Sequence, residues 1–333
     1  MPERPRKLDE GDRAGRAGPD HADRPPLTAT HASEVVSEID VRAGDGLARV
    51  PFSVVLSDDG DVVVFSFLPG GGSVLDRFAP DGAHLQVLAK FEPGHERGRL
   101  SGPAGVASDG AGNLYVPDSD RCCIVKFSPT GELVDEFGQE GTAEGELRGP
   151  RDVDAAADGA MIIADTENHR VQIWEPDGTV RACFGAEEDE DEESAYLESG
   201  SGEGEFHRPY GVTFDEAGAL WVADTNNHRV QRLSMTDGFE HAFGHVGEEA
   251  GALHYPIDLR IDSAGRAVVA DEGGRRIQWF STDGKLERAL LLVEAMPEGT
   301  SFADVDVDDD GIVYVPVGPI GKVFRVRAGE PKS

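Results

Sequence analysis

Hydrophobic residues recur along the chain in short runs separated by turn residues. One run follows a proline, as at 153–157, and a second follows a Gly-containing turn, as at 161–164. A third begins at an Arg-Val-Gln element, and a fourth follows an Asp-Gly turn, as at 180–184. Short apolar runs joined by Asp-Gly and Gly-Asn turns are typical of antiparallel hairpins. Each unit therefore predicts a four-stranded meander.

The unit recurs through most of the chain. Its proline stands at Pro51, Pro103, Pro150, Pro209 and Pro256, and Ala303 has that place in the last unit. One meander cannot cover both of its faces, so neighbouring units are expected to stack around an axis. Six register positions predict an all-β fold, a six-bladed β-propeller of four-stranded blades.

The last unit lacks a fourth strand, because the chain ends soon after Arg327. The alternating segment 35–41 supplies that strand from the other end, and we expect it to pair into the last blade and close the ring. This predicts a propeller over residues 34–328. Residues 1–33, rich in Pro, Gly, Arg, Asp and His without periodicity, are predicted to be a disordered tail, and residues 329–333 a C-terminal tail.

One motif marks the start of the third strand in four units. It reads Asp-Thr-Glu-Asn-His-Arg-Val-Gln from Asp165 and Asp-Thr-Asn-Asn-His-Arg-Val-Gln from Asp224. An Asp at a strand end accepts hydrogen bonds from loop amides, so a structural role is expected for these repeated residues. They are Asp118, Asp165, Asn168, His169, Arg170, Asp224, Asn227, His228, Arg229 and Asp271.

This Asp-x-x-Asn-His-Arg-Val-Gln pattern resembles the repeat of the NHL-repeat family. The two units from Asp165 and Asp224 match it closely, and the units with Asp118 and Asp271 match it in part. The resemblance implies a six-bladed β-propeller over about residues 34–328.

The charge of the chain narrows the choice of partners. Acidic residues number 64 against 31 basic ones, a formal net charge of -33, which would repel a phosphate backbone and excludes nucleic acid as the expected partner. Such acidity is typical of proteins from concentrated salt, and the scarcity of lysine is also typical of GC-rich genomes; the choice between these stays open.

The compartment is predicted from what the chain contains. No apolar run is long enough for a signal peptide or a membrane span, so no membrane partner is expected. The three cysteines are odd in number, and Cys122 and Cys123 are adjacent, so a disulfide framework is not expected and a cytoplasmic location is predicted.

The candidate site lies where the repeats differ. Loops that join blades and loops between the second and third strands should project from one face of the ring. The predicted ligand-binding residues on this face are Arg148, Arg151, Asp152, His207, Arg208, Tyr210, His254, Tyr255 and Asp258. Residues 186–204, with seven consecutive acids at 187–193, are predicted to be an insertion that forms a mobile loop on the same rim. This loop could attract a basic partner or serve only as a solvated insertion.

Two metal hypotheses arise on this face, although no cofactor is the main expectation. His207 and His254 each stand two residues before a blade proline, but a zinc site normally has three or four protein ligands. Asp152, Asp258 and Asp304 recur near the axial channel and would suit Ca²⁺ through their oxygens.

Two functions follow from these patterns. The first is a non-enzymatic binding or scaffold module for a protein or a small molecule. The acidic surface would favour a basic protein partner. No Ser-His-Asp constellation, phosphate loop or complete metal cluster appears in the sequence. The alternative is a metal-dependent lyase or hydrolase, because the propeller is similar to those of amidating lyases that cleave peptidyl hydroxyglycine and of lactonases.

Overall fold

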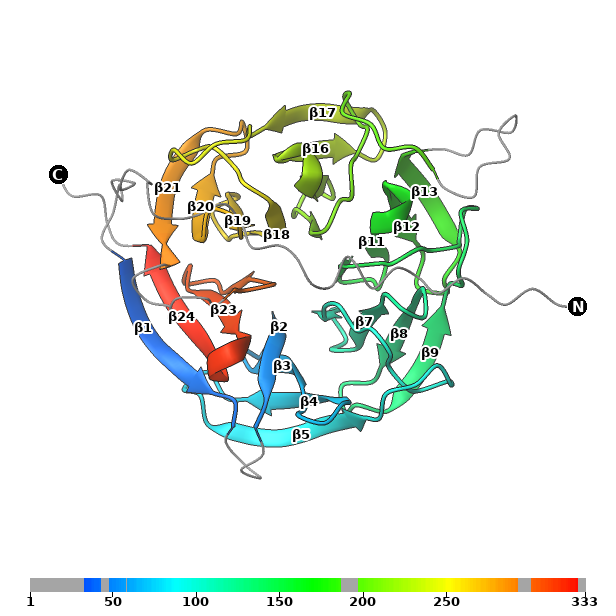
Figure 1. The fold of residues 1–333 in the computed structure, drawn as a ribbon, viewed down its shortest axis with the longest axis vertical. Coiled ribbons are helices and arrows are strands. Elements are labelled where there is room, and N and C mark those ends of the chain that lie inside the picture. The colour runs from blue at the N-terminus through cyan, green and yellow to red at the C-terminus, as the bar shows by residue number, and fades with distance from the viewer. Residues whose placement is uncertain (1–32, 43–47, 58, 187–196, 293–300, 329–333) are drawn as a thin grey trace, which may run out of the picture.

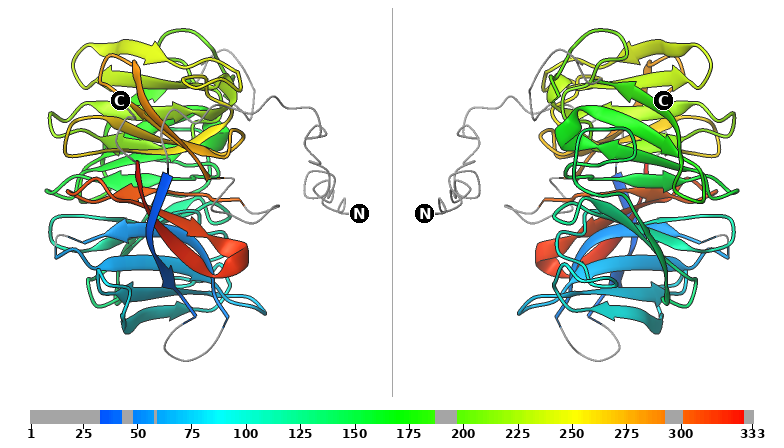
Figure 2. Two further views of the ribbon diagram at one scale, coloured as in Figure 1. Left: turned by 90° about the vertical axis from the view of Figure 1, so that its left-hand side faces the viewer. Right: turned by 90° about the vertical axis from the view of Figure 1, so that its right-hand side faces the viewer.

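Six antiparallel sheets stand around a central axis in the computed structural model of the chain (Figure 1). The structure describes residues 33–42, 48–57, 59–186, 197–292 and 301–328. Each sheet has four strands, and seen from the side the ring is thinner along its axis than across it (Figure 2). The predicted six-bladed β-propeller is confirmed.

The first three blades follow one another along the chain, and each runs from the axis outward. Blade 1 comprises β2 (Val50–Leu56), β3 (Val62–Phe67), β4 (Ser73–Phe78) and β5 (His84–Phe91). Blade 2 comprises β6 (Ala107–Ser108), β7 (Leu114–Asp118), β8 (Cys123–Phe127) and β9 (Leu133–Phe137). Blade 3 comprises β10 (Val153–Ala155), β11 (Met161–Asp165), β12 (Arg170–Trp174) and β13 (Val180–Gly185).

The remaining blades complete the circle. Blade 4 comprises β14 (Val212–Phe214), β15 (Leu220–Asp224), β16 (Arg229–Ser234) and β17 (Gly238–Phe243). Blade 5 comprises β18 (Pro256–Ile261), β19 (Ala267–Asp271), β20 (Arg276–Phe280) and β21 (Leu286–Leu291). Blade 6 comprises β22 (Asp306–Val307), β23 (Val313–Val317), β24 (Lys322–Ala328) and, on the outside, β1 (Ser33–Asp40).

The N-terminal strand closes the ring, as predicted. β1 pairs antiparallel with β24, with Ile39 opposite Val323 and Asp40 opposite Lys322 (Figure 1). Ile39 is 1% exposed and packs with residues of blades 6 and 1. Because the first and last segments share one sheet, the last blade needs both ends of the chain to be complete.

The hydrophobic core is divided among the seams between blades. Six apolar clusters each join two neighbouring blades, so both faces of every sheet are covered. The largest side chains in them are Trp174, Trp221 and Trp279, each at most 1% exposed. Because the blades stack around an axis, each sheet has a neighbouring blade on both sides, and the apolar residues of both of its faces are buried.

The hydrogen bonds between inner strands correct the register of the last unit. Val305 donates its N–H to Asp258, and Val54 donates to Asp304, just as Val212 donates to Asp152. Asp304 is therefore the counterpart of Asp152 and Asp258, and the residue two before it, Phe302, has the place of the blade proline. The assignment of that place to Ala303 was wrong by one residue, because no proline marks it in the last unit.

Some predicted segments fall outside the described residues. They are the tail 1–33 except its last residue, the acids at 187–193 and the C-terminal residues 329–333. The end of the predicted insertion is described, and Gly200 accepts a hydrogen bond from Asn227 Nδ2 as Gly141 does from Asn168. Residues from Gly200 onward thus have the place of the ordinary loop between blades. None of the helices in the described segments has the length and apolar character needed to cross a bilayer.

Candidate functional site

The repeat aspartates hold the loops of one face of the ring. The buried carboxylate of Asp165 accepts the N–H of Arg148 at 2.7 Å, Nε of Arg170 at 2.7 Å and Nδ2 of Asn168 at 2.9 Å. Equivalent hydrogen bonds occur at Asp118, Asp224 and Asp271. Each of these acids joins the loop that enters its blade to the turn before the third strand, so both sets of loops lie on the same face.

The repeat histidines connect each blade to the next. His169 Nδ1 accepts the N–H of Arg208 at 3.1 Å, and His228 Nδ1 accepts the N–H of Tyr255 at 3.2 Å. Arg208 and Tyr255 directly precede blade prolines and have positive φ angles of 53° and 60°. Burial lowers the pKa of His169 and of His228 below the ordinary range, which favours the neutral ring whose Nδ1 can accept these bonds.

The two candidate zinc histidines pack against these repeat histidines. The ring of His207 lies 5.6 Å from that of His169, and the ring of His254 lies 5.7 Å from that of His228. Within the described segments no three His, Cys, Asp or Glu side chains gather closely enough to hold a metal ion. The described residues thus supply no third ligand beside His207 and His254, and zinc binding by this pair stays a prediction.

The carboxylates nearest the axis link the innermost strands. Asp304 Oδ2 accepts the N–H of Val54 at 2.7 Å, and Asp258 Oδ2 accepts that of Val305 at 2.8 Å. Asp152 Oδ2 accepts the N–H of Val212 at 2.9 Å. Each carboxylate thus fixes one inner strand to the next blade.

A single arginine lies among these three carboxylates. Arg260 Nη1 is 2.8 Å from Asp258 Oδ1 and 3.5 Å from Asp152 Oδ2, and Arg260 Nη2 is 3.7 Å from Asp304 Oδ1. The guanidinium group supplies a cation at the place that the calcium hypothesis assigned to a metal. Arg260 stands two residues after Asp258 in β18, so strand alternation directs both side chains to the axis.

One guanidinium does not balance all the acid at this depth. Burial raises the pKa of Asp152 to about 7, and the neighbouring Asp304 adds to the rise while Arg260 opposes it. Burial likewise raises the pKa of Asp258 well above its ordinary range and that of Asp306 to about 6. Burial therefore favours the protonated form of these carboxyl groups more than it would at the protein surface.

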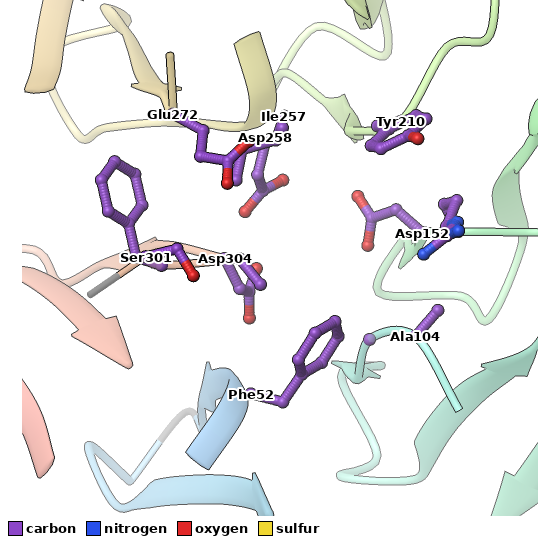
Figure 3. A pocket seen from close by; sticks show the side chains of 13 residues that line it. Phe52, Ala104, Asp152, Tyr210, Ile257, Asp258, Glu272, Ser301 and Asp304 are labelled. Carbon is purple, nitrogen blue, oxygen red and sulfur yellow. The ribbon is translucent and has the colours of Figure 1, made fainter. Parts of the chain in front are cut away.

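Above this cluster the channel opens into a pocket of about 240 Å³ (Figure 3). Every blade contributes the residue that directly follows its proline position. These residues are Phe52, Ala104, Arg151, Tyr210, Ile257 and Ala303. Asp152, Asp258 and Asp304, each one residue further along the chain, line the same pocket (Figure 3). The pocket is thus lined by side chains that differ from blade to blade and by three carboxylates.

A second pocket of about 220 Å³ adjoins the first toward blades 4 and 5. Tyr210, Ile257 and Glu272 line both pockets, and Arg208 and Tyr255 line the second. The two hollows therefore form one site that extends from the axis toward the rim.

Glu272 breaks the repeat at this junction. The equivalent Ser119, Thr166 and Thr225 each donate a side-chain hydrogen bond to the carbonyl of the next blade's proline, at 2.6 to 2.7 Å. An ionised glutamate has no proton to donate in this way. Its carboxylate instead points into the pocket at the channel mouth (Figure 3).

The structure brings together part of the predicted ligand-binding face. Arg151, Asp152, Tyr210 and Asp258 line the mouth pocket, and Arg208, Tyr210 and Tyr255 line the adjoining one. Arg148, His207 and His254 line neither; their backbone N–H groups bind the repeat aspartates.

Sequence reasoning missed several residues of this site. Phe52, Ile257, Glu272 and Arg260 were not singled out, although each has a readable signal. Phe52 and Ile257 follow a proline as Arg151 and Tyr210 do, and Glu272 replaces a hydroxyl residue. The ring of residues after each proline is recognisable from the repeat register alone.

Aromatic and acidic groups together define the chemistry of the mouth. The guanidinium of Arg151 lies over the Tyr210 ring, 5.3 Å from its centroid. Asp152 is 8% exposed, and its Oδ1 accepts no hydrogen bond from the residues that the structure describes. Such a site can recognise a ligand through ring faces and carboxylate oxygens.

Comparison with known proteins agrees with this architecture. Residues 147–174 and 206–233 match the family model of the NHL repeat. Rat (Rattus norvegicus) peptidylglycine alpha-amidating monooxygenase is 23% identical over 250 residues, which cover 62% of this chain and 25% of that protein. The chain thus spans about a quarter of the length of this curated relative.

Two solved structures share the fold at low sequence identity. A virginiamycin B lyase from Staphylococcus aureus, in a catalytically inactive form with quinupristin, has a TM-score of 0.57 and 12% identity, covering 89% of this chain and 99% of that one. A gluconolactonase from Xanthomonas campestris has a TM-score of 0.57 and 16% identity, covering 85% and 87%. At such identities the likeness extends to the fold alone.

Proposed function

Because the chain is a six-bladed β-propeller of the NHL-repeat type, we propose that it is a non-enzymatic binding module that engages its ligand at the mouth of the axial channel. One observation carries the proposal: the six residues around the mouth occupy a single repeat position, yet they include two aromatic residues, an arginine, an isoleucine and two alanines. Residues that hold the blades together recur in each repeat. Residues that contact a ligand are expected to differ between repeats, as the residues at this position do.

The groups beneath the mouth support a binding role. Asp152, Asp258 and Asp304 each accept a backbone N–H of the next blade and contact Arg260. One oxygen of each carboxylate, Oδ2, is thereby committed to holding the inner strands. The pocket of about 240 Å³ is smaller than the roughly 300–1,000 Å³ of drug-sized sites, and it suits a small molecule or a single side chain of a protein partner.

Saturation-transfer NMR with a fragment library tests this role. Ligands of the mouth should lose their signal with the variant Tyr210→Ala, which removes an aromatic wall. The control variant Asp309→Ala changes an acid in a separate pocket lined by Asp308–Asp310 and should leave the signals unchanged. Binding that is indifferent to Tyr210→Ala would refute a ligand site at the mouth.

The alternative function is a lyase or hydrolase, and one observation favours it. Burial raises the pKa of Asp152 to about 7 beside a pocket, which would suit a catalytic acid or base. Incubation with lactones and with α-hydroxyglycine peptides, with Zn²⁺ or Ca²⁺ added, separates the two functions. Turnover that Asp152→Asn abolishes would establish an enzyme and overturn the proposal.

A further inference from the structure

The mouth of the channel is richer in carboxylates than in cations. Asp152, Asp258, Asp304 and Glu272 approach it from three blades, against Arg151 at the wall and Arg260 beneath. Asp154 and Asp306 lie one step deeper on the same inner strands, where they accept backbone N–H groups of Phe214 and Leu56. An anion entering the pocket would therefore meet repulsion, whereas a cation would be attracted.

Aromatic rings stand beside these carboxylates. In Figure 3 the rings of Phe52 and Tyr210 and the carboxylates of Glu272 and Asp152 converge on the same space. A ring face attracts a cation through its quadrupole, and the attraction grows when water is excluded. The Arg151 guanidinium already lies over Tyr210 in this manner.

Asp152 adds a specific acceptor. Asp152 as a whole residue is 8% exposed, its Oδ2 is bound by Val212, and its Oδ1 has no hydrogen-bond donor among the described residues. A Cβ on Gly105 would lie 3.4 Å from this Oδ1, and Gly105 itself lines the pocket, so the oxygen borders the cavity. A carboxylate oxygen at the cavity wall can accept a hydrogen bond from a ligand or from water.

We infer that the mouth binds an organic cation, the ammonium or guanidinium end of a basic side chain presented by a partner protein. The inference rests on the proposed function and names its ligand class. Glu272, Asp152 and Tyr210 determine the specificity. The adjoining pocket of about 220 Å³, which shares Tyr210 and Glu272 with the mouth, then receives the residues that flank the basic one.

The position of Glu272 explains why this blade differs from its neighbours. In blades 3 and 4 the same position is Thr166 or Thr225, whose hydroxyl ties one blade to the next. Blade 5 has instead a carboxylate at the junction of both pockets.

Isothermal titration at low ionic strength tests the inference with four probes. They are the peptide acetyl-Gly-Lys-Gly-amide, its norleucine counterpart, n-butylammonium and methylguanidinium. We expect one site that binds the lysine peptide about tenfold or more tighter than the uncharged norleucine peptide, equivalent to about 1.4 kcal/mol. Tighter binding of the peptide than of butylammonium assigns the site to a side chain, and equal binding assigns it to a free small cation.

Variants at position 272 separate a loss of binding from a loss of folding. Glu272→Thr restores the residue used in blades 3 and 4 and should fold as well as the wild type, which its melting curve checks. It should lower the affinity for the lysine peptide about tenfold, as should Glu272→Gln. Asp309→Asn removes the same charge outside the mouth and should change the affinity less than about twofold. Tyr210→Phe keeps the ring and should retain most of the binding.

The pH dependence gives an independent readout. A bound cation favours the ionised form of Asp152, whose pKa burial raises to about 7, so the affinity should rise between about pH 6 and pH 8. If the norleucine and lysine peptides bind equally and Tyr210→Ala abolishes both, the cation inference is wrong while the binding role stands. If Glu272→Thr and Asp309→Asn weaken lysine binding alike, the attraction comes from net charge and the inference is overturned.

Discussion

Replacing Arg260 by methionine should destabilise the ring in a manner that depends strongly on pH. The guanidinium group contacts three aspartates that are 2–8% exposed, and the substitution leaves all three without a cation. Removing one partner from a buried ion pair typically costs about 3–5 kcal/mol. We expect a loss of that size in the free energy of unfolding at about pH 8.

At lower pH the loss should shrink. Without Arg260 the carboxyl groups can take up protons, which removes the unpaired charges that cause the loss. Protonation is already favoured in the wild type, since burial raises the pKa of Asp152 to about 7 and that of Asp306 to about 6. The folded state then binds more protons than the unfolded state between about pH 4 and pH 7, so these groups make stability fall as pH rises through that window. The fall should be steeper in Arg260→Met.

Urea unfolding at about pH 8 and about pH 5.5 measures both effects. The loss caused by Arg260→Met should be smaller at the lower pH by about 2 kcal/mol, which is the effect of roughly one and a half pKa units on one carboxyl. Arg260→Lys keeps the charge but a single ammonium cannot span three carboxylates, so an intermediate loss is expected. Arg97→Met breaks an exposed ion pair with Asp135 and should cost less than about 1 kcal/mol. A loss for Arg260→Met that is equal at both pH values would refute this account of the cluster.

Three further predictions concern the frame of the ring. Deleting residues 34–41 removes β1 with the buried Ile39 and Val41 and should lower the melting temperature of the whole propeller, whereas deleting 1–30 removes no residue of β1; equal melting temperatures would contradict closure by this strand. Gly211→Ala should cost about 1–3 kcal/mol, because its Cβ would lie 2.5 Å from Asp258 Cα, whereas Gly105→Ala, with its nearest atom at 3.4 Å, should cost less than about 1 kcal/mol in the same urea assay. His169→Gln should lose stability relative to the wild type above about pH 6.5, and this difference should narrow on acidification, because the lowered pKa of His169 gives a contribution that disappears as the ring is protonated; a difference constant from pH 7.5 to pH 5 would show that the ring does not act as the acceptor for Arg208.

The blades were predictable because their signals are local. Alternation places the apolar side chains of a strand such as β12 toward neighbouring blades, and turn residues such as Asp177 and Gly178 end one strand and begin the next. The repeat period counted the blades, and the missing fourth strand in the last unit pointed to segment 35–41. The shift from Ala303 to Phe302 escaped notice because only a hydrogen-bond register could place a unit without its proline.

The site was predictable only in part. Arg151 and Tyr210 stood out because they differ between copies, and the same comparison extended to every residue after a proline would have found Phe52 and Ile257. The pairing of His207 and His254 as metal ligands remains a hypothesis without a third ligand in the described residues. The repeat register shows which residues of neighbouring blades occupy equivalent positions, but it does not show which of their side chains are in contact.

The sequence by itself determined the repeat, the number of blades, the strand that closes them and the positions that vary. The tertiary structure decided which variable positions act together. Asp152, Asp258 and Asp304 come from blades 3, 5 and 6, and they reach one guanidinium only because closure of six blades brings the inner strands around a narrow axis. Secondary structure follows from local periodicity, whereas such a convergence depends on the radius of the closed ring, to which every seam between blades contributes.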